Sequence, residues 1–217
     1  MSYRPITDRS RVRRGRPRAQ YDEAAVHGVL DAGDICHVAY CIEQQPYLLP
    51  TAYARSGDRV FLHGAVANRM LGQLAKGIEA VVTVTLVDGY VLARSQFHHS
   101  MNYRCAVLFG RAIPVTDPVE KHRALRAIVE HMVPGRAAHS RPPNEKELRI
   151  TQVLEFEIDE ASVKVRQGDP RDDAEDLELF HWAGVIPTHR GAHDAVPSAD
   201  LSRAIKTPEH IKRASTG

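Results

Sequence analysis

The feature that most restricts the fold of this chain is a series of short apolar runs separated by turn residues. The run from Ile35 to Ile42 is typical, because it is rich in residues that favour extended structure. Predicted turns between such runs lie at residues 44–46, 56–58, 88–89 and 160–161. Six or seven strands without regular alternation of strand and helix indicate an antiparallel barrel. The sequence therefore predicts a mainly β (α+β) fold.

Several of these runs are apolar on both faces of the strand. Alternate residues of the Ile35–Ile42 run point to opposite sides of a sheet, and both sets are apolar. A monomeric barrel needs only its inner face apolar. The outer face is then covered by helices or by a second subunit, and we predict a homodimer.

Short helices interrupt the strands at positions with clear start signals. Asp22, Asn68 and Asp117 are good N-cap residues, and they open predicted helices over 22–32, from 68 to about 76, and from 117 to about 132. A basic, proline-containing loop over 136–144 follows, and one more short helix is predicted near Trp182. These helices flank the barrel.

The length of 217 residues favours one domain with extensions. We divide the chain into a basic N-terminal arm (1–18), a barrel domain (19–193) and a weakly ordered tail (194–217). The arm holds seven arginines, and residues 169–178 form an acidic run. Both charged segments are interpreted as solvated arms; alternatively they meet each other, or the basic arm approaches an anionic ligand or cofactor.

Composition excludes several classes of protein. A net charge of +2 argues against a nucleic-acid binder. No apolar run approaches the roughly 20 residues that cross a bilayer. Three cysteines without paired spacing suit a reducing, cytoplasmic setting. No metal site is predicted, because the adjacent His98 and His99 would point to opposite faces of an extended chain.

Two segments have the residue types of a binding site. In residues 63–69, a strand ends in small residues and a helix begins, so backbone N–H groups and Arg69 could bind a phosphate. The alternative is an ordinary capped helix with an exposed Arg69. Residues 93–104 mix arginine, histidine, serine and aromatic residues between apolar strands, which suits the wall of a pocket for a polar aromatic ligand. The alternative there is a polar crossover loop.

Taken in order along the chain, several stretches resemble one family. They are Gln45–Thr51, Leu62–Ala65 with Asn68-Arg69, Val87–Gly89, Phe97–Arg104, Pro134–Arg136, Lys164–Arg166 and Trp182–Pro187. Over residues 10–190 the chain resembles the pyridoxamine 5′-phosphate oxidase-like FMN-binding split barrels. It is most similar to the flavin-nucleotide-binding branch that includes the nitroimidazole-resistance proteins.

The resemblance implies a six-stranded split β-barrel homodimer with FMN at the subunit interface. The cofactor-binding residues that it implies are Leu49, Pro50 and Thr51 at the flavin ring, His63, Gly64, Ala67, Asn68 and Arg69 at the phosphate, and Arg94, Ser95, Asn102, Tyr103 and Arg104 in the rest of the pocket. The preference for FMN over FAD or a deazaflavin is left open. Oxidation of pyridoxine 5′-phosphate is doubtful, because Asn68-Arg69 replaces a basic pair and the C-terminal substrate signature is missing.

We therefore expect an FMN-dependent oxidoreductase acting on a small organic molecule. His98 or His99 is a candidate proton donor, since an imidazole titrates near neutrality. A flavin-binding or flavin-sensing protein without efficient turnover is an alternative that needs the same pocket. A haem-binding protein with His98 or His99 as iron ligand is a further alternative.

Overall fold

The computed structural model describes residues 6–189, 191, 194–202 and 204–215, and in this part of the chain eight strands form one antiparallel sheet. Arg4 of the basic arm lies outside the described residues. The strands are β1 (Ala19–Gln20), β2 (Ile35–Ile42), β3 (Gln45–Ser56), β4 (Arg59–Ala65), β5 (Glu79–Leu92), β6 (Ser100–Pro114), β7 (Thr151–Arg166) and β8 (Gly184–Pro187).

Six of these strands close into a ring. The pairing order is β7-β4-β3-β2-β5-β6, and β6 pairs again with β7. The predicted antiparallel six-stranded barrel is confirmed. Side chains that point inward form the main core, among them Val38, Val82, Leu108 and Leu154, all fully buried.

All helices but the last lie between strands or against the ring. The helices are α1 (Glu23–Ala32), α2 (Arg69–Leu74), α3 (Pro118–Met132), α4 (Glu145–Ile150) and α5 (Glu209–Ser215), and the 3-10 turns are η1 (Arg16–Arg18), η2 (Gln96–His98), η3 (Arg136–His139) and η4 (Ala174–Glu178). Asp22, Asn68 and Asp117 accept backbone hydrogen bonds at the starts of α1, α2 and α3, as predicted. In the part of the chain that the structure describes, no helix has the length and apolar character needed to cross a membrane.

Helices α1 and α2 add apolar residues to the main core, whereas α3 covers the outside of β3, β4 and β7. Ala124 and Ile128 of α3 pack on Phe61 and Val153, which are buried on the outer side of the ring. Gly110 lets β6 approach β7 closely, because an added Cβ would lie 1.8 Å from the carbonyl oxygen of Glu157, and the pairing register shifts at this point. The bend predicted at Gly110 stays a prediction.

Two predicted hairpins are wrong. Asp88-Gly89 does not turn the chain: β5 continues through it with a bulge, and the turn comes at η2. Glu160-Ala161 likewise lies inside the continuous strand β7. Both pairs of residues favour turns, but Asp88-Gly89 lies in a bulge and Glu160-Ala161 lies within a long strand. Neither position turns the chain, because pairing with β6 continues on both sides of it.

Other boundaries also differ from the sequence predictions. The β2–β3 turn is at Glu43-Gln44, both with positive φ, one residue before the predicted site. Trp182 lies outside any helix, and the nearby turn η4 comes earlier, at Ala174–Glu178. Helix α4 was not predicted, although Asn144 and Glu147 form a capping box at its start.

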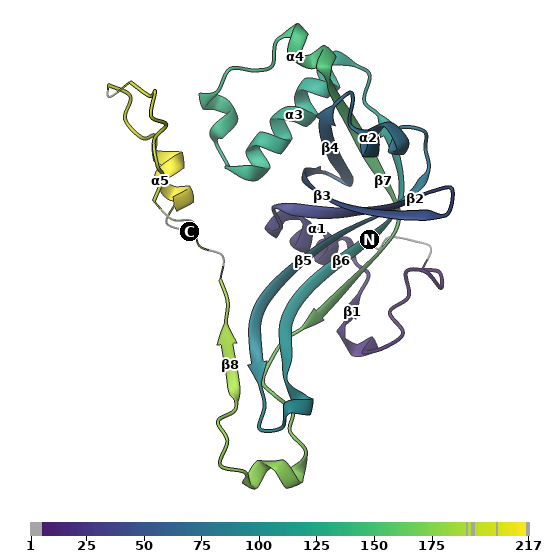
Figure 1. Ribbon diagram of the computed structural model, residues 1–217, viewed down its shortest axis with the longest axis vertical. Coiled ribbons are helices and arrows are strands. Elements are labelled where there is room, and N and C mark those ends of the chain that lie inside the picture. Colours follow the sequence, from purple (N-terminus) through teal and green to yellow (C-terminus); the bar gives the residue numbers. More distant parts are fainter. Residues whose placement is uncertain (1–5, 190, 192–193, 203, 216–217) are drawn as a thin grey trace.

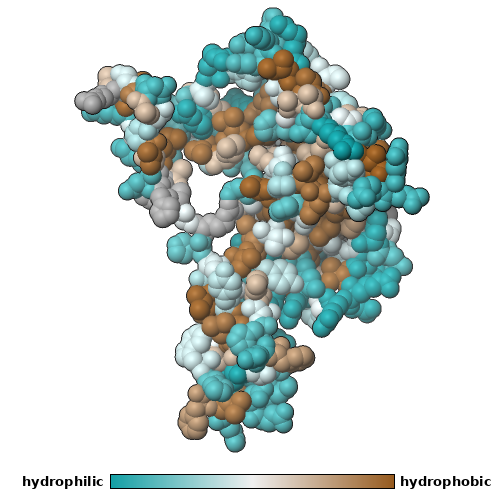
Figure 2. Space-filling model, in the orientation of Figure 1, coloured by the Kyte–Doolittle hydropathy of each residue, from teal (hydrophilic) through white to brown (hydrophobic). Residues whose placement is uncertain are grey.

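The β5–β6 pair extends beyond the ring as an arm, and β8 runs along its β5 edge (Figure 1). Turn η4 lies at the tip of this arm (Figure 1). Hydrophobic residues are exposed along this part of the molecule (Figure 2). Phe97 of η2 is exposed, and so are Phe180 and Trp182 in the segment between η4 and β8. At the other end of the chain, His210 of α5 stacks on His139 of η3 with ring centroids 4.4 Å apart.

The basic N-terminal arm is held against β7 by a buried carboxylate. Glu160 accepts hydrogen bonds from the backbone N and hydroxyl of Thr7, the hydroxyl of Ser10 and Nε of Arg9, the last at 2.7 Å. β1 then pairs with β7 at Gln20. The division of the chain into arm, barrel domain and tail stays a prediction, but residues 6–18 follow the surface of the ring.

We expect Glu160→Ala to lower the free energy of unfolding by about 2 kcal/mol at pH 7, because the donors of Thr7, Ser10 and Arg9 lose a charged acceptor. Burial alone would raise the pKa of Glu160, but the hydrogen bonds from Ser10, Thr7 and Arg9 lower it to about 2. Stability that depends on a lowered carboxyl pKa is present above the ordinary value and is lost as the pH falls toward 2.

Urea unfolding of both proteins between pH 7 and pH 2.5 measures this effect. The difference between them should shrink below about pH 4.5. Glu157→Gln, an exposed position on the same strand, is the control and should leave stability nearly unchanged. A constant difference across the pH range would contradict the role of the Glu160 charge.

Candidate functional site

The outer side of the ring has an exposed face that no described helix covers. The pairing register puts His37 beside Pro50 and Thr83, and Ala39 beside Leu48 and Val81. We call this surface the open face; it consists of Ile35, His37, Ala39, Leu48, Pro50, Val81, Thr83, Thr85 and Val107. Leu48 is 61% exposed and Ile35 54%, so much apolar area faces solvent in one chain.

The side chains of the three β3 residues predicted to bind the flavin ring point to different sides of the strand. Pro50 points to the open face, because it pairs with His37. Leu49 and Thr51 pair with the core residues Val38 and Cys36, so their side chains point to the inner side. Leu49 is nevertheless 42% exposed. A flat ring could therefore reach this stretch through its backbone from the open face.

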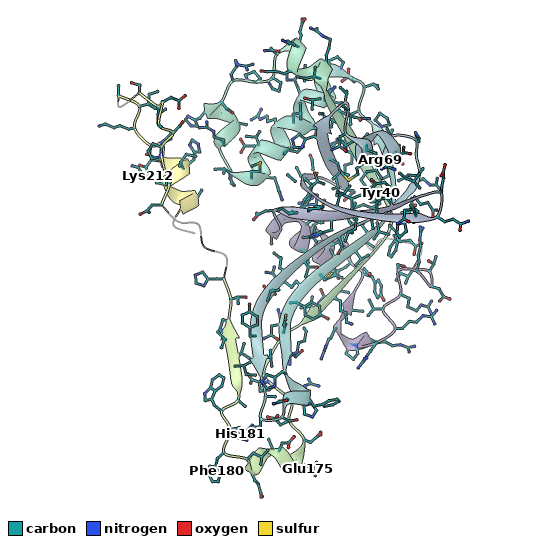
Figure 3. The ribbon with its side chains drawn as sticks, viewed as in Figure 1. Tyr40, Arg69, Glu175, Phe180, His181 and Lys212 are labelled. Carbon is teal, nitrogen blue, oxygen red and sulfur yellow. The ribbon has the colours of Figure 1, made fainter. Side chains whose placement is uncertain are left out.

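Arg69 lies on an aromatic pair at the start of α2. Its guanidinium is 4.9 Å from the ring centroid of Tyr47 and donates a 3.0 Å hydrogen bond to the Tyr47 hydroxyl. Tyr47 in turn stacks on Tyr40, with centroids 5.4 Å apart. Figure 3 labels Tyr40 and Arg69, which lie in the same part of the molecule. Among the described residues, no carboxylate forms an ion pair with Arg69. Its positive charge is therefore available to an anionic ligand.

The small residues before Arg69 let the chain turn closely. An added Cβ on Gly64 would lie 2.9 Å from Cδ1 of Leu71. Ala67 is exposed, and the next residue, Asn68, caps α2 by accepting a hydrogen bond from the backbone N of Leu71 at 3.1 Å. Within the predicted phosphate-binding segment, Gly64 therefore lies against Leu71 and Asn68, at the start of the helix that carries Arg69.

The other predicted cations are already neutralised. Asp172 accepts hydrogen bonds from the backbone N and the guanidinium of Arg94, at 2.9 and 3.0 Å, and from the backbone N of Ser95. Arg104 binds Asp88 through two hydrogen bonds of 2.9 and 2.7 Å. Burial would raise the pKa of Asp172, but the bonds from Arg94 and Ser95 lower it, so it stays charged.

Two carboxylates of the acidic run, Asp172 and Asp173, therefore contact the arm formed by the β5–β6 pair. His98 contacts Asp173, with Nε2 3.1 Å from the carboxylate, and Nδ1 of His99 is 3.0 Å from the carbonyl oxygen of Ser95. Asp176 also lies near His98; both are half-buried, and Asp173 between them is exposed. Both candidate proton donors are thus occupied by local partners.

Asn102 and Tyr103 lie at the junction of the arm and the ring. Asn102 is buried and accepts a hydrogen bond from Arg166. Tyr103 pairs with Arg166 across β6 and β7 and is half-buried. These two predicted residues are consecutive in β6, whereas Arg69 belongs to α2.

His63 does not share a side of β4 with Gly64. Phe61 and His63 alternate with the core residues Val60 and Leu62, so the His63 side chain points outward, toward α3. Its Nδ1 is buried and has no hydrogen-bond partner among the described residues. Burial lowers the pKa of His63, which favours the neutral imidazole.

His63 lines a cavity of about 880 Å³ between α3 and the loop over 136–143. We call it the α3 cavity. Leu125, Ile128 and Met132 form an apolar wall. His122 and Arg126 add polar groups, while Arg141 at the rim is paired with Glu147 at 2.7 Å. Sequence reasoning missed this cavity; the only signals for it were the basic loop 136–144 and the outward alternation of Phe61 and His63.

Comparison with known proteins gives close matches. The family described as "Pyridoxamine 5'-phosphate oxidase" matches residues 22–165. The flavocytochrome Anf3 from Azotobacter vinelandii is 37% identical with a TM-score of 0.89, and the match covers 97% of this chain and 98% of that one. The FAD and heme binding protein from Mycobacterium smegmatis is 33% identical with a TM-score of 0.87, covering 92% and 98%.

More distant matches add less. A putative 5-nitroimidazole antibiotic resistance protein from Bacteroides thetaiotaomicron is 21% identical with a TM-score of 0.56, covering 68% of this chain and 86% of that one, and it shows the fold alone. A stretch of 34 residues is 47% identical to an uncharacterized protein of Rhizobium meliloti (strain 1021). That stretch is 16% of this chain and 22% of the Rhizobium protein.

Proposed function

The chain belongs to the pyridoxamine 5′-phosphate oxidase family, and from that premise we propose that it is a flavoprotein that transfers electrons or hydride to a small organic molecule. Membership confirms the predicted resemblance, and the similar solved structures agree with the predicted split-barrel fold. The flavin supplies the redox chemistry when bound, and the chain binds and orients it.

One observation carries this proposal: Arg69 keeps its charge unpaired while Arg94 and Arg104 do not. The guanidinium of Arg69 is fixed by Tyr47 and has no carboxylate partner among the described residues. A guanidinium held in this way can form two parallel hydrogen bonds to a phosphate. We propose that the flavin phosphate binds at Arg69 and Asn68, with the ring along the β3 backbone near Pro50.

The two nearly full-length relatives support a flavin. The Azotobacter protein is a flavocytochrome, and the Mycobacterium protein binds FAD and haem. The family resemblance predicts FMN, and FAD contains the same ring, ribityl chain and first phosphate. Arg69 would meet that phosphate in either molecule, so the flavin that co-purifies, identified by mass spectrometry, decides between them.

The open face supports a homodimer with the flavin between subunits. A monomer would leave Ile35, Leu48 and their neighbours in water, and contiguous apolar patches of this kind are typical of interfaces. We propose that two open faces pack together and exclude water from the flavin ring. Rapid anaerobic reduction of the flavin by NADH or NADPH would favour an enzyme over a flavin-sensing protein, whereas a flavin that neither donor reduces would favour the sensor.

A second function, haem binding, is favoured by the α3 cavity. The cavity contains a neutral imidazole whose Nδ1 has no partner, and neutral imidazole is the form that binds iron. The apolar wall of α3 suits a porphyrin, and Arg126 could pair with a propionate. His98 and His99, the earlier candidates for an iron ligand, contact Asp173 and Ser95 instead. We propose His63 as the haem ligand.

We expect Arg69→Ala to weaken flavin binding by about 1.5–3 kcal/mol, the contribution of a charge-assisted hydrogen bond. Quenching of flavin fluorescence on titration into apoprotein measures it. Arg111→Ala removes an exposed arginine on the outer side of β6 and is the matched control, with affinity nearly unchanged. Equal affinity of Arg69→Ala and the parent protein would contradict the phosphate site.

We expect haem added to the protein to give a Soret band that His63→Ala shifts or abolishes, because the iron loses its ligand. Absorption and electron paramagnetic resonance spectra of the iron measure this, independently of any activity. His98→Ala and His99→Ala are the controls and should leave both spectra unchanged. A spectrum altered by His98→Ala but not by His63→Ala would overturn the assignment.

A further inference from the structure

A second cavity, of about 600 Å³, lies where the N-terminal arm crosses the end of β7. We call it the basic cavity. Five of its lining residues are cationic and none is acidic; the five are Arg14, Arg18, Lys164, Arg166 and Arg171. None of them forms an ion pair with a carboxylate in the described residues. Like charges repel, so this grouping costs free energy unless an anion joins it.

Among these cations, Arg166 shows most clearly that the positive charge lacks a negatively charged partner. Its side chain is buried, and its Nε has no hydrogen-bond partner among the described residues. The remaining guanidinium nitrogens donate only to neutral acceptors: the Asn102 side chain and the carbonyl oxygens of Gly168 and Asp169. Burial, followed by repulsion from Arg18 and Arg171, lowers the pKa of Arg166. The charge of Asp169 acts in the opposite direction but does not reverse the shift, and no carboxylate accepts a hydrogen bond from Arg166. A buried cation without a carboxylate in direct contact is costly, and a bound anion would compensate it.

The cavity is built by a chain path that brings the arginines together. Gly15 has a φ of 71°, a left-handed turn that favours glycine, and it lies against the Lys164 side chain. The turn places Arg14 and Arg18 on the same side of β7. Thr7, Ser10 and Arg9 fix the arm through Glu160. The arginine-rich start of the chain is thus positioned, at least in part, over one surface of the ring.

That surface belongs to the same side of the sheet as the open face. Lys164 pairs with Cys105, and Cys105 accepts a hydrogen bond from Thr85 at 3.3 Å. Thr85 is part of the open face. A ligand lying on the open face could therefore extend one end into the basic cavity.

We infer that the basic cavity binds the diphosphate of an adenine dinucleotide. A diphosphate carries at least two negative charges and several acceptor oxygens, which five convergent cations can match, and guanidinium groups suit phosphate oxygens. A single carboxylate would leave most of these cations unpaired. The adenine dinucleotide is FAD or a nicotinamide dinucleotide, which share the same diphosphate. In the first case the inference rests on the flavin site proposed above and extends it.

ADP is the first probe, because it contains the diphosphate without a flavin or nicotinamide. Isothermal titration of ADP into the full-length protein should show binding, and the double variant Arg18→Gln/Arg171→Gln should weaken it at least about tenfold. Both positions line the cavity but, unlike Arg166, neither is buried. Arg16→Gln, in the same turn but outside the lining, is the control and should change affinity less than about threefold.

Titrations of FAD, FMN and NADPH identify the source of the diphosphate. If it belongs to the flavin, FAD should bind more tightly than FMN, and the double variant should abolish that preference while FMN affinity stays the same. If the diphosphate belongs to the electron donor, the double variant should weaken the binding of NADPH. The affinities for FAD and FMN should then both stay nearly unchanged. Either pattern supports the inference.

Two results would overturn it: no binding of ADP, or ADP affinity that the double variant leaves unchanged. Tighter binding of a single-stranded oligonucleotide than of ADP would also overturn it, and would assign the cavity to nucleic acid. Failure of the flavin proposal is distinguishable, because it appears as no binding of FMN to the parent protein, or as an FMN affinity that Arg69→Ala leaves unchanged, whatever the result with ADP.

Discussion

The structure depends on the pairing of β7 with three other strands. β7 forms hydrogen bonds with β4 along its first half and with β6 along nearly all of its length. β1, which directly follows the N-terminal arm, pairs near the end of β7. Without these pairings the ring would be an open sheet with two free edges. The β6–β7 pairing can continue past Gly110 only because this residue has no side chain, since a side chain there would collide with the β7 backbone.

Closure fixes which residues face outward, and the outer side is covered by different means in different places. Helix α3 covers β4 and the first half of β7, where Phe61 and His63 point. The N-terminal arm covers the second half of β7, where Glu160, Lys164 and Arg166 point. The four strands between these coverings keep the open face. Of the three proposed sites, the haem site lies under α3, the diphosphate site lies under the N-terminal arm, and the flavin ring lies on the open face, which no described helix covers.

Local signals in the sequence predicted much of the fold. The caps at Asp22, Asn68 and Asp117 were recognisable because capping depends on a residue and its next three neighbours. Asp88-Gly89 was misread because its residues favour a turn, while the choice between a turn and a bulge depends on β6, which follows later in the chain. The candidate site was less predictable. The contact of Arg94 with Asp172 joins residues 78 positions apart, so the sequence could not show that this cation is neutralised. The direction of His63 could have been predicted by extending the alternation of Val60 and Leu62 by one residue.

The position of β7 in the chain has a consequence for how the protein folds. β7 is the last strand of the ring to be made during synthesis, and β1, β4 and β6 all depend on it. Until residue 166 has emerged, the edge of β4 and the arginine-rich arm have no strand to pair with. Contacts between residues so far apart in sequence also slow folding, because a long loop must close before they form. During that interval the nascent chain has an unpaired β4 edge, and of the arginines that later surround the basic cavity only Arg14 and Arg18 are present. Together with the other arginines of the N-terminal arm they give the chain a local positive charge that repels a second copy.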